Sequence, residues 1–497
     1  MPRTSLALAA LLVLTALAGA AAAADDDQLY VPETDPLVLD KLEQWQDLKF
    51  GLLMHWGTYC QWGIVESWSI CPEDYGWCER REGDNPQDYG AYKREYENLK
   101  TTFNPVEFAP ERWAAAAARA GMRYVVFTTK HHDGFCMFDT KATDYKITDA
   151  DCPFHTHEKA DVTAAIFDAF RARGQWTGAY FSKPDWHDEN YWWPYFPPRD
   201  RNVNYDPEAY PDRWERFVQF THTQIMELMT GYGPLDILWL DGGWVAKKSL
   251  EDIRGWYGGW VEETTSGFFK RNIVNQDIRM DELVAKARGA QPGLIVVDRA
   301  VPGRNQNYLT PENRVPDEAL PYPWESCIIS GGSWSWIPDP KYLSVREAVH
   351  LLVDIVAKGG NLLLNIAPSP AGTWDEGAYV LLDGIGAWMA VNGEAIYGTR
   401  ALAPYKAGRV CLTRGRADGA VHAIYLAEEG EAVPPAVITV EGVVPAEGAR
   451  VTMLGVEGEL EWRRVGAGFE VVVPEGARET PPCEDAWVVR VSGVVGG

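Results

Sequence analysis

Between about residues 35 and 400, short apolar runs alternate with longer segments in which apolar residues recur at helical spacing. The short runs have the length of buried strands, and the longer segments have the length of amphipathic helices. Repeated alternation of this kind predicts parallel strands joined by right-handed crossovers, as a doubly wound sheet or a closed barrel. The expected strands are residues 50–56, 124–130, 176–182, 235–241, 294–299 and 361–366, and the expected helices are residues 110–120, 161–173, 210–230, 280–288 and 344–357.

Polar or aromatic residues end these expected strands, which favours the barrel. They are His55, the pair His131 and His132, Tyr180, Asp241, Arg299 and Asn365. In a (β/α)8 barrel, catalytic groups project from the C-terminal ends of many strands into one mouth. A doubly wound sheet would bind its ligand at a single topological switch point. No G-x-G-x-x-G fingerprint, the usual sign of such a site, follows an expected strand. We therefore expect an α/β fold with a (β/α)8-like, TIM-type barrel.

The pattern changes after Gly398. Short alternating runs at residues 421–426, 436–440, 450–454, 469–473 and 486–491 are separated by Gly, Glu and Pro, which is typical of an antiparallel β-sandwich. We expect a barrel domain at residues 25–399 and a C-terminal β-sandwich at residues 400–497. Because no convergent polar cluster is visible there, a supporting domain is favoured over an independent sugar-binding module.

Residues 1–24 have the pattern of a signal peptide. Arg3 supplies a basic start, residues 6–18 an apolar stretch, and residues 20–24 a run of alanines before three aspartates. An uncleaved membrane anchor is the alternative, because the alanines extend the apolar stretch. We expect a secreted, periplasmic or lysosomal protein with no membrane segment after cleavage.

Composition excludes some function classes. The chain has 497 residues, with 46 basic against 71 acidic side chains, and a formal charge of −25 argues against nucleic-acid binding.

Eight cysteines in such a long chain do not make a disulfide scaffold. Cys60, Cys71 and Cys78 lie close in sequence, so an oxidising compartment could close one bridge whose pairing the sequence does not define. Zinc is not expected there, since no histidine has finger spacing.

Asp241 is the most informative single residue. It closes an apolar run and precedes two glycines, so a carboxylate is expected at a strand end that a substrate can approach. A capping aspartate is the alternative. Acid/base chemistry on a glycoside needs a second carboxylate. Glu312 and Glu325, both on the long connection after Arg299, are the candidates, and spacing does not choose between them.

The His131-His132 pair could hold a metal or a neutral polar ligand. Adjacent residues at a strand end point to opposite faces, so we do not expect one metal to be held by both. No third ligand has a recognised spacing. We therefore favour polar contacts to a neutral ligand, with structural histidines as the remaining alternative.

Several segments together resemble a known family, the α-L-fucosidases of glycoside hydrolase family 29. They keep their order over residues 49–399. They are Lys49-Phe50-Gly51 through His55-Trp56-Gly57, Phe103-Asn104-Pro105, residues 130–135, Gly178-Ala179-Tyr180, residues 238–242, and Lys358-Gly359-Gly360-Asn361 through Asn365. The resemblance implies a barrel with a C-terminal β-sandwich, and retaining hydrolysis of terminal α-L-fucosyl linkages without a cofactor or metal.

The resemblance also implies residue roles. Asp241 matches the family nucleophile, and Glu312 fits the acid/base best, with Glu325 as the alternative or as a substrate-binding residue. The family's Glu-Trp pair appears as Glu66-Ser67-Trp68, and the inserted serine leaves open which ring contacts the sugar. The residues that match the fucose-binding pocket are His55, Glu66, Trp68, His131, His132, Tyr180, Trp239 and Arg299.

The implied partner is a fucosylated glycan, with an oligomer possible. The stretch Trp186 to Phe196 has no counterpart and could be a platform for the rest of the glycan or simple loop packing. Two other functions stay open: an exo-glycosidase for a galactose-like sugar, and a catalytically silent fucose-binding protein. Asp241 and Glu312 disfavour the second, because a lectin needs neither.

Overall fold

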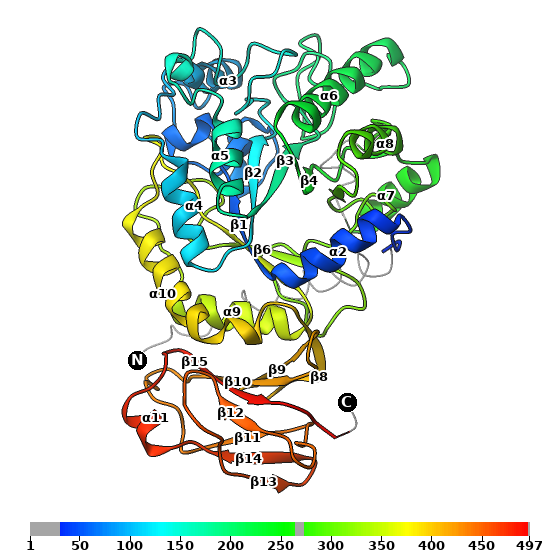
Figure 1. Cartoon of the computed structure of the whole chain (residues 1–497). Helices are drawn as coiled ribbons and strands as arrows, with labels where there is room; N and C mark the ends of the chain where they lie inside the picture. Colours follow the sequence, from blue (N-terminus) through cyan, green and yellow to red (C-terminus); the bar gives the residue numbers. More distant parts are fainter. Residues whose placement is uncertain (1–29, 264–272, 496–497) are drawn as a thin grey trace, which may run out of the picture.

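The computed structural model describes residues 30–263 and 273–495 (Figure 1). The expected signal peptide at residues 1–24 lies outside these ranges. Within them, no helix combines the length and apolar character needed to cross a bilayer.

The expected barrel is confirmed as a curled parallel sheet whose strands follow the order β5-β4-β3-β2-β1-β7-β6. The strands are β1 (Phe50–Met54), β2 (Tyr124–Lys130), β3 (Trp176–Ser182), β4 (Ile237–Asp241), β5 (Ile295–Asp298), β6 (Glu325–Ile329) and β7 (Asn361–Asn365). Six of these seven coincide with expected strands, and β6 is additional. Its sequence, Glu-Ser-Cys-Ile-Ile, begins with polar residues that hide the strand pattern.

Residues 306–313 close the gap between β5 and β6. Gln306 bridges antiparallel to Val297 of β5, and Glu312 bridges parallel to Cys327 of β6. Backbone hydrogen bonds from Asn307 N–H to Val296 C=O (2.9 Å) and from Cys327 N–H to the carbonyl of residue 311 (3.2 Å) support the two junctions. This segment therefore occupies the eighth position of the barrel and carries Glu312 to its mouth.

Helices surround the sheet (Figure 1). They are α2 (Pro36–Leu48), α3 (Tyr89–Glu97), α4 (Pro110–Arg119), α5 (Val162–Arg171), α6 (Pro211–Gly231), α7 (Leu250–Glu263), α8 (Met280–Ala290), α9 (Val345–Ala357) and α10 (Glu376–Asn392). The five expected helices agree with α4, α5, α6, α8 and α9. At the start of α9, Ser344 and Glu347 form a capping box in which each side chain satisfies the other's backbone N–H.

The N-terminal end of the barrel is filled by side chains. Trp45 of α2 stacks on Tyr308, with ring centroids 4.1 Å apart, and both belong to the same buried cluster as Leu53, Trp239 and Leu363. Such a packed interior leaves the opposite, C-terminal end as the place for a ligand.

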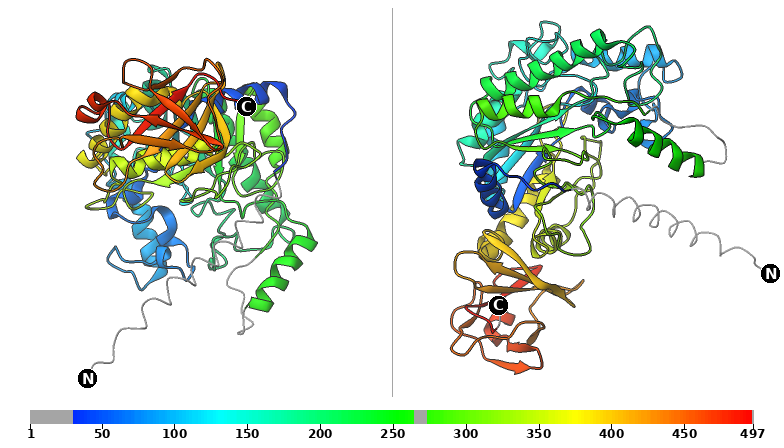
Figure 2. Two further views of the ribbon diagram at one scale, coloured as in Figure 1. Left: turned by 90° about the horizontal axis from the view of Figure 1, so that it is seen from below. Right: turned by 90° about the vertical axis from the view of Figure 1, so that its right-hand side faces the viewer.

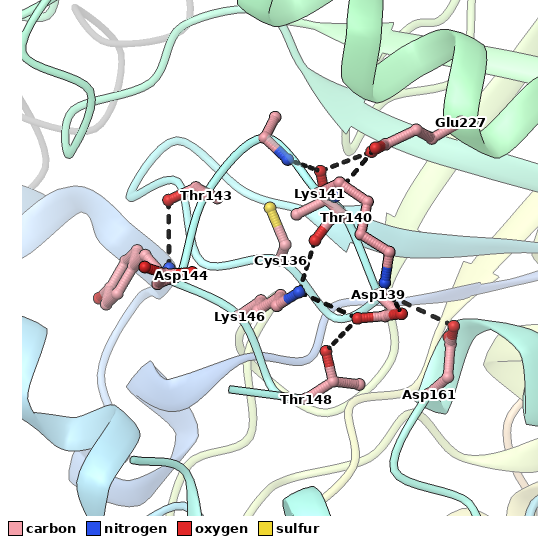
Figure 3. A network of polar contacts seen from close by, with 12 residues as sticks. Cys136, Asp139, Thr140, Lys141, Thr143, Asp144, Lys146, Thr148, Asp161 and Glu227 are labelled. Carbon is pink, nitrogen blue, oxygen red and sulfur yellow. Dashed lines mark hydrogen bonds and ion pairs between the residues drawn. The ribbon is translucent and has the colours of Figure 1, made fainter. Parts of the chain in front are cut away.

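The segment that follows β2 is fixed by a polar network (Figure 3). Asp139 accepts hydrogen bonds from Lys146 Nζ (3.0 Å) and Thr148 Oγ1 (2.8 Å). Thr140 Oγ1 donates to Glu227 of α6 at 2.5 Å. These contacts tie the segment to the neighbouring helix α6.

The antiparallel C-terminal sheets expected from the sequence are also confirmed. Their strands are β8 (Thr399–Ala407), β9 (Val410–Gly415), β10 (Val421–Leu426), β11 (Val437–Val440), β12 (Val451–Met453), β13 (Trp462–Val465), β14 (Gly468–Val472) and β15 (Ala486–Val491), with the short helix α11 (Glu475–Glu479). A five-stranded and a three-stranded sheet share one apolar core. They lie below α9 and α10 (Figures 1 and 2), and Trp388 Nε1 of α10 donates to the carbonyl of Ala486 at 2.9 Å.

Candidate active site

A cavity of about 160 Å³ lies at the C-terminal ends of the barrel strands. Ten of the eleven site residues expected from the sequence line it, and Glu325 does not. The full lining is Leu53, His55, Glu66, Trp68, His131, His132, Tyr180, Arg201, Trp239, Asp241, Trp244, Arg299, Glu312, Cys327 and Trp334.

Asp241, the last residue of β4, is held from several sides. Tyr180 Oη donates to its Oδ2 at 2.7 Å, and Arg299 donates to its Oδ1 at 3.2 Å. Burial opposes ionisation of the Asp241 carboxyl, but the charge of Arg299, the His132 ring and the hydrogen bonds from Tyr180 and the Gly242 N–H outweigh it and hold its pKa well below the usual range. Asp241 is therefore an oriented, ionised carboxylate.

Arg299 also holds the second carboxylate. Its other terminal nitrogen donates to Glu312 Oε2, while Trp334 Nε1 donates to Glu312 Oε1 at 3.3 Å. The Glu312 side chain is 43% exposed, whereas Asp241 is 16% exposed. The two carboxylates therefore flank one guanidinium, with Asp241 deep in the cavity and Glu312 at its rim.

His55 and His131 are fixed in opposite tautomers. The Asn365 amide donates to the Trp334 carbonyl at 2.8 Å, so its Oδ1 accepts from His55 Nδ1 at 3.0 Å. His55 then presents an unprotonated Nε2. Ser67 Oγ accepts from the Asp133 N–H at 3.0 Å, and His131 Nδ1 is the acceptor available to its hydroxyl proton among the contacts of the described residues, so His131 presents a protonated Nε2.

Burial keeps the three histidines neutral. It lowers the pKa of His55 to about 4 and that of His132 to about 3, although the nearby Asp241 charge opposes both changes. The pKa of His131 is also lowered well below its usual value, by burial first and then by the two other histidines. A neutral ring can both donate and accept a hydrogen bond, so it can bind hydroxyl groups of a neutral ligand.

The expectation that His131 and His132 point to opposite faces is wrong. Their ring centroids lie 4.1 Å apart, and both rings line the cavity. The reason is that β2 ends at Lys130 and the chain then turns, with the Gly134 N–H bonded to the His131 carbonyl at 3.1 Å. The strand alternation on which the expectation depended has ended before the histidines.

This turn brings three possible metal ligands together. One ligand atom each of His131, His132 and Asp241 lies within 4.8 Å of the others. However, the Arg299 guanidinium already forms an ion pair with the Asp241 carboxylate, and its positive charge would repel a cation placed there. The donor set therefore fits a neutral polar ligand better than a metal ion.

Glu66 and Trp68 enter the cavity from the short helix η3 (Glu66–Ile70). Glu66 is 1% exposed, and its Oε1 has no hydrogen-bond partner among the described residues. Burial, followed by the charge of Glu312, raises the pKa of Glu66 well above its usual value, which favours the protonated carboxyl. The ring of Trp68 stands edge-on to His132 at 5.2 Å.

Five lining residues were not expected from the sequence: Leu53 and Cys327, which belong to barrel strands, and Arg201, Trp244 and Trp334. Arg201 places its guanidinium over the rings of Trp68 (4.6 Å) and Trp244 (5.0 Å). The glycine pair that separates Trp244 from Asp241 is a signal that could have identified Trp244. Trp334 follows Gly-Gly-Ser in a loop, which is a similar signal, whereas Arg201 lies in an irregular stretch with no motif.

Glu325 lies elsewhere, contrary to its expected position on a connecting loop. It begins β6 at the N-terminal end of the barrel and is fully buried. Tyr124 Oη donates to its Oε2 at 2.5 Å, and Tyr308 Oη donates to its Oε1 at 3.2 Å. Burial raises the pKa of Glu325 to about 7, although the hydrogen bonds from the two tyrosines act to lower it. Glu325 therefore belongs to the polar interior of the barrel.

The aromatic stretch from Trp186 to Phe196 divides into two parts. Trp186 and Trp192 are buried and stack on each other at 5.1 Å, and Trp186 also contacts the His132 ring at 5.1 Å. Tyr195, in contrast, is 74% exposed. The first two rings therefore support the cavity wall from behind.

Comparison with known proteins agrees with this geometry. The family model described as α-L-fucosidase matches residues 17–394. The chain belongs to the α-L-fucosidase family. It is thus a glycoside hydrolase of the family 29 type, as the sequence resemblance implied. The Homo sapiens tissue α-L-fucosidase is 28% identical, covering 98% of this chain and 97% of the relative.

Solved α-L-fucosidases share the fold. Isoenzyme 1 from Paenibacillus thiaminolyticus is 26% identical with a TM-score of 0.70, covering 92% of this chain and 99% of its own. The Thermotoga maritima α-fucosidase is 25% identical with a TM-score of 0.68, covering 93% and 100%. A Bacteroides thetaiotaomicron relative, solved as a trapped covalent intermediate with 2-fluoro-fucosyl fluoride, is 20% identical with a TM-score of 0.68, covering 93% and 97%.

Proposed function

We propose that this α-L-fucosidase family member removes terminal α-L-fucosyl groups from glycans by a retaining, two-step mechanism. The observation that carries the proposal is the placement of Asp241 and Glu312 on either side of the Arg299 guanidinium at one cavity. Retaining glycosidases use one carboxylate as nucleophile and another as acid/base. The covalent intermediate of the Bacteroides relative supports the same chemistry here.

Asp241 is the proposed nucleophile. Its pKa is held low, so it is ionised throughout the neutral range, and Tyr180 and Arg299 fix its orientation. The carboxylate attacks the anomeric carbon, and the bond to the leaving oxygen breaks. The product of this step is a fucosyl ester of Asp241.

Glu312 is the proposed acid/base. Its position at the rim suits a group that meets the leaving oxygen and later water. In the free enzyme its carboxylate is paired with the Arg299 guanidinium, which orients it toward the cavity. Glu312 protonates the leaving oxygen and, in the second step, deprotonates the water that releases fucose.

Glu66 is a second carboxyl that can carry a proton in the cavity. Its raised pKa and its unpaired Oε1 make it a hydrogen-bond donor to a sugar hydroxyl in this proposal. The same features would suit a general acid, so Glu66 is the alternative that experiments on Glu312 must include.

The cavity supports exo-action on a single sugar. At about 160 Å³ it is smaller than the pockets of about 300 Å³ or more that hold drug-sized ligands. His55 offers an acceptor, His131 a donor, and Trp68 and Trp239 offer apolar ring surface. These groups suit a deoxy sugar, which presents hydroxyls on some atoms and a methyl group on another.

The proposal is tested by following the products from a panel of defined fucosyl linkages. Proton NMR of the first-formed sugar should show α-L-fucose, because two displacements retain the anomeric configuration. First-formed β-L-fucose would contradict the retaining mechanism. Release of a galactose-like sugar in preference to fucose would contradict the substrate assignment.

We further propose that residues 1–24 are removed on export, that the barrel spans residues 25–399, and that the sandwich spans residues 400–497. The likeness to tissue and plasma α-L-fucosidases of Homo sapiens supports a secreted or lysosomal protein. N-terminal sequencing of the protein recovered from its producing cells tests cleavage near Ala24 and would contradict it if residue 1 were retained.

A further inference from the structure

Two buried thiols lie near the cavity wall: Cys71 directly follows η3, and Cys78 ends the short helix η4 (Gly76–Cys78). Cys71 is fully buried, and Cys78 is 4% exposed. Their sulfur atoms and a carboxylate oxygen of Glu73 all lie within 4.8 Å of one another. Cys60, the third cysteine of this region of the sequence, is not part of this group.

Glu73 connects this loop, residues 71–78, to the cavity. Its carboxylate accepts hydrogen bonds from Arg201 Nε (2.8 Å), from an Arg201 terminal nitrogen (2.5 Å) and from the Arg201 backbone N–H (3.1 Å). Arg201 in turn lies against Trp68 and Trp244 and lines the cavity. The position of this wall therefore depends on where the loop holds Glu73.

We propose that Cys71 and Cys78 form a disulfide that closes this loop and fixes Glu73 against Arg201. A disulfide needs sulfur atoms about 2 Å apart, so the two thiols, already within 4.8 Å, must approach by side-chain movement. In the first step, one thiolate attacks a low-molecular-weight disulfide oxidant of the glutathione type and releases one reduced thiol. The second thiolate then displaces the other reduced thiol, so two protons leave the protein and the oxidant is reduced.

A metal ion is a poorer occupant of the same group. Both carboxylate oxygens of Glu73 are engaged by Arg201, which leaves two sulfur ligands for a metal that prefers four. A positive guanidinium bound to Glu73 would also oppose a cation at that point. A bridge uses the two sulfurs and leaves the Glu73–Arg201 pair intact.

The bridge should affect substrate binding more than chemistry. Arg201 touches neither Asp241 nor Glu312 among the contacts of the described residues, but it lines the cavity in which the substrate would bind. Closing a short ring reduces the conformations open to residues 72–77, and hence the freedom of Glu73. Opening it should therefore raise KM and leave kcat unchanged.

Thiol mapping tests the bridge without reference to activity. The full-length protein is refolded or produced with oxidised glutathione present, denatured without reductant, alkylated and digested. We expect six labelled cysteines, the eight in the sequence less the two in the bridge, and a linked peptide pair that contains Cys71 and Cys78. Labelling of all eight, a bridge that includes Cys60, or bound zinc with both thiols reduced would overturn the proposal.

A second experiment tests the link to the cavity, and only this part depends on the proposed function. Reduction with dithiothreitol and the double variant Cys71→Ser/Cys78→Ser should each raise KM for a fucosyl disaccharide on the order of tenfold, the scale of one lost charged hydrogen bond. Glu73→Gln should raise KM similarly, and reduction of this variant with dithiothreitol should not raise its KM further. Cys483→Ser, at a partly buried thiol of the C-terminal domain, is the matched control. An unchanged KM in the reduced protein would overturn the link, while the mapping result would stand by itself.

Discussion

Arg299 donates from one terminal nitrogen to Asp241 and from the other to Glu312. One side chain thereby positions both carboxylates that the proposed mechanism needs. Burial of this guanidinium lowers its own pKa, but the charges of Glu312 and Asp241 outweigh that effect, so it stays charged. It stabilises the ionised form of Asp241 and pairs with Glu312 at the rim of the cavity.

The first prediction distinguishes the proton donor. An acid matters most when the leaving group is poor, so Glu312→Ala should lower kcat for natural disaccharides by several orders of magnitude and for activated aryl fucosides far less. The measurement is kcat of the variant and of the unchanged enzyme on both kinds of substrate. Glu325→Gln, at the other end of the barrel, is the control and should show no dependence on the leaving group. If Glu66→Ala shows the strong dependence and Glu312→Ala does not, the roles must be exchanged.

A second prediction concerns His55 and the question of a metal. If His55 accepts a hydrogen bond from a sugar hydroxyl, His55→Ala should cost about 1–3 kcal/mol in kcat/KM. Treatment with EDTA should leave activity unchanged, because the proposed pocket binds the sugar through neutral rings. Inactivation by EDTA that added zinc or manganese reverses would contradict this account of His55, His131 and His132.

The third prediction tests the tautomer of His131. Ser67→Ala removes the hydroxyl that directs its proton to His131 Nδ1, so the ring can adopt the other tautomer and lose its donor in the cavity. We expect kcat/KM to fall about fivefold, for a cost of about 1 kcal/mol. Ser69→Ala is the matched control, because it removes another buried hydroxyl of the same short helix, and Ser69 does not line the cavity. Equal effects of the two substitutions would indicate a packing role only.

The fourth prediction is a pH profile. As the pH falls, His55 with a pKa of about 4 is protonated before His132, whose pKa is about 3. Protonation turns the His55 acceptor into a donor. The acid limb of kcat/KM should therefore lie near pH 4, with full activity retained through the ordinary histidine range near 6.5. An acid limb near pH 6.5 would show that a catalytic histidine titrates normally.

Most of the barrel could be predicted from the sequence because its strands are continuous apolar runs with polar ends. The segment at residues 306–313 could not, because it has no strand pattern and takes its place through pairing with β5 and β6. Helix α7 was also missed. Its glycine and tryptophan content does not give a clear amphipathic pattern.

The candidate site, like the barrel, could be predicted from the sequence only in part. Residues at the ends of strands, such as Asp241 and Arg299, were predictable because parallel strands bring their C-terminal ends to one mouth. Arg201 was not, because a salt bridge to Glu73, more than a hundred residues earlier in the chain, places it in the wall. Glu325 and Glu312 were equivalent candidates in the sequence, but Glu325 begins β6 and is buried inside the barrel, whereas Glu312 pairs with Cys327 and lines the cavity.

The claim that Asp241 is the nucleophile is tested most directly by trapping the fucosyl-enzyme. Incubation with 2-fluoro-fucosyl fluoride, digestion and mass spectrometry should locate one added fluorofucosyl group on the peptide that contains Asp241. In Asp241→Gly the label should be absent and kcat should fall by several orders of magnitude, with added azide restoring turnover of an aryl fucoside as the β-fucosyl azide. A label on Glu312 or Glu66, or near-normal activity of Asp241→Gly, would contradict the account.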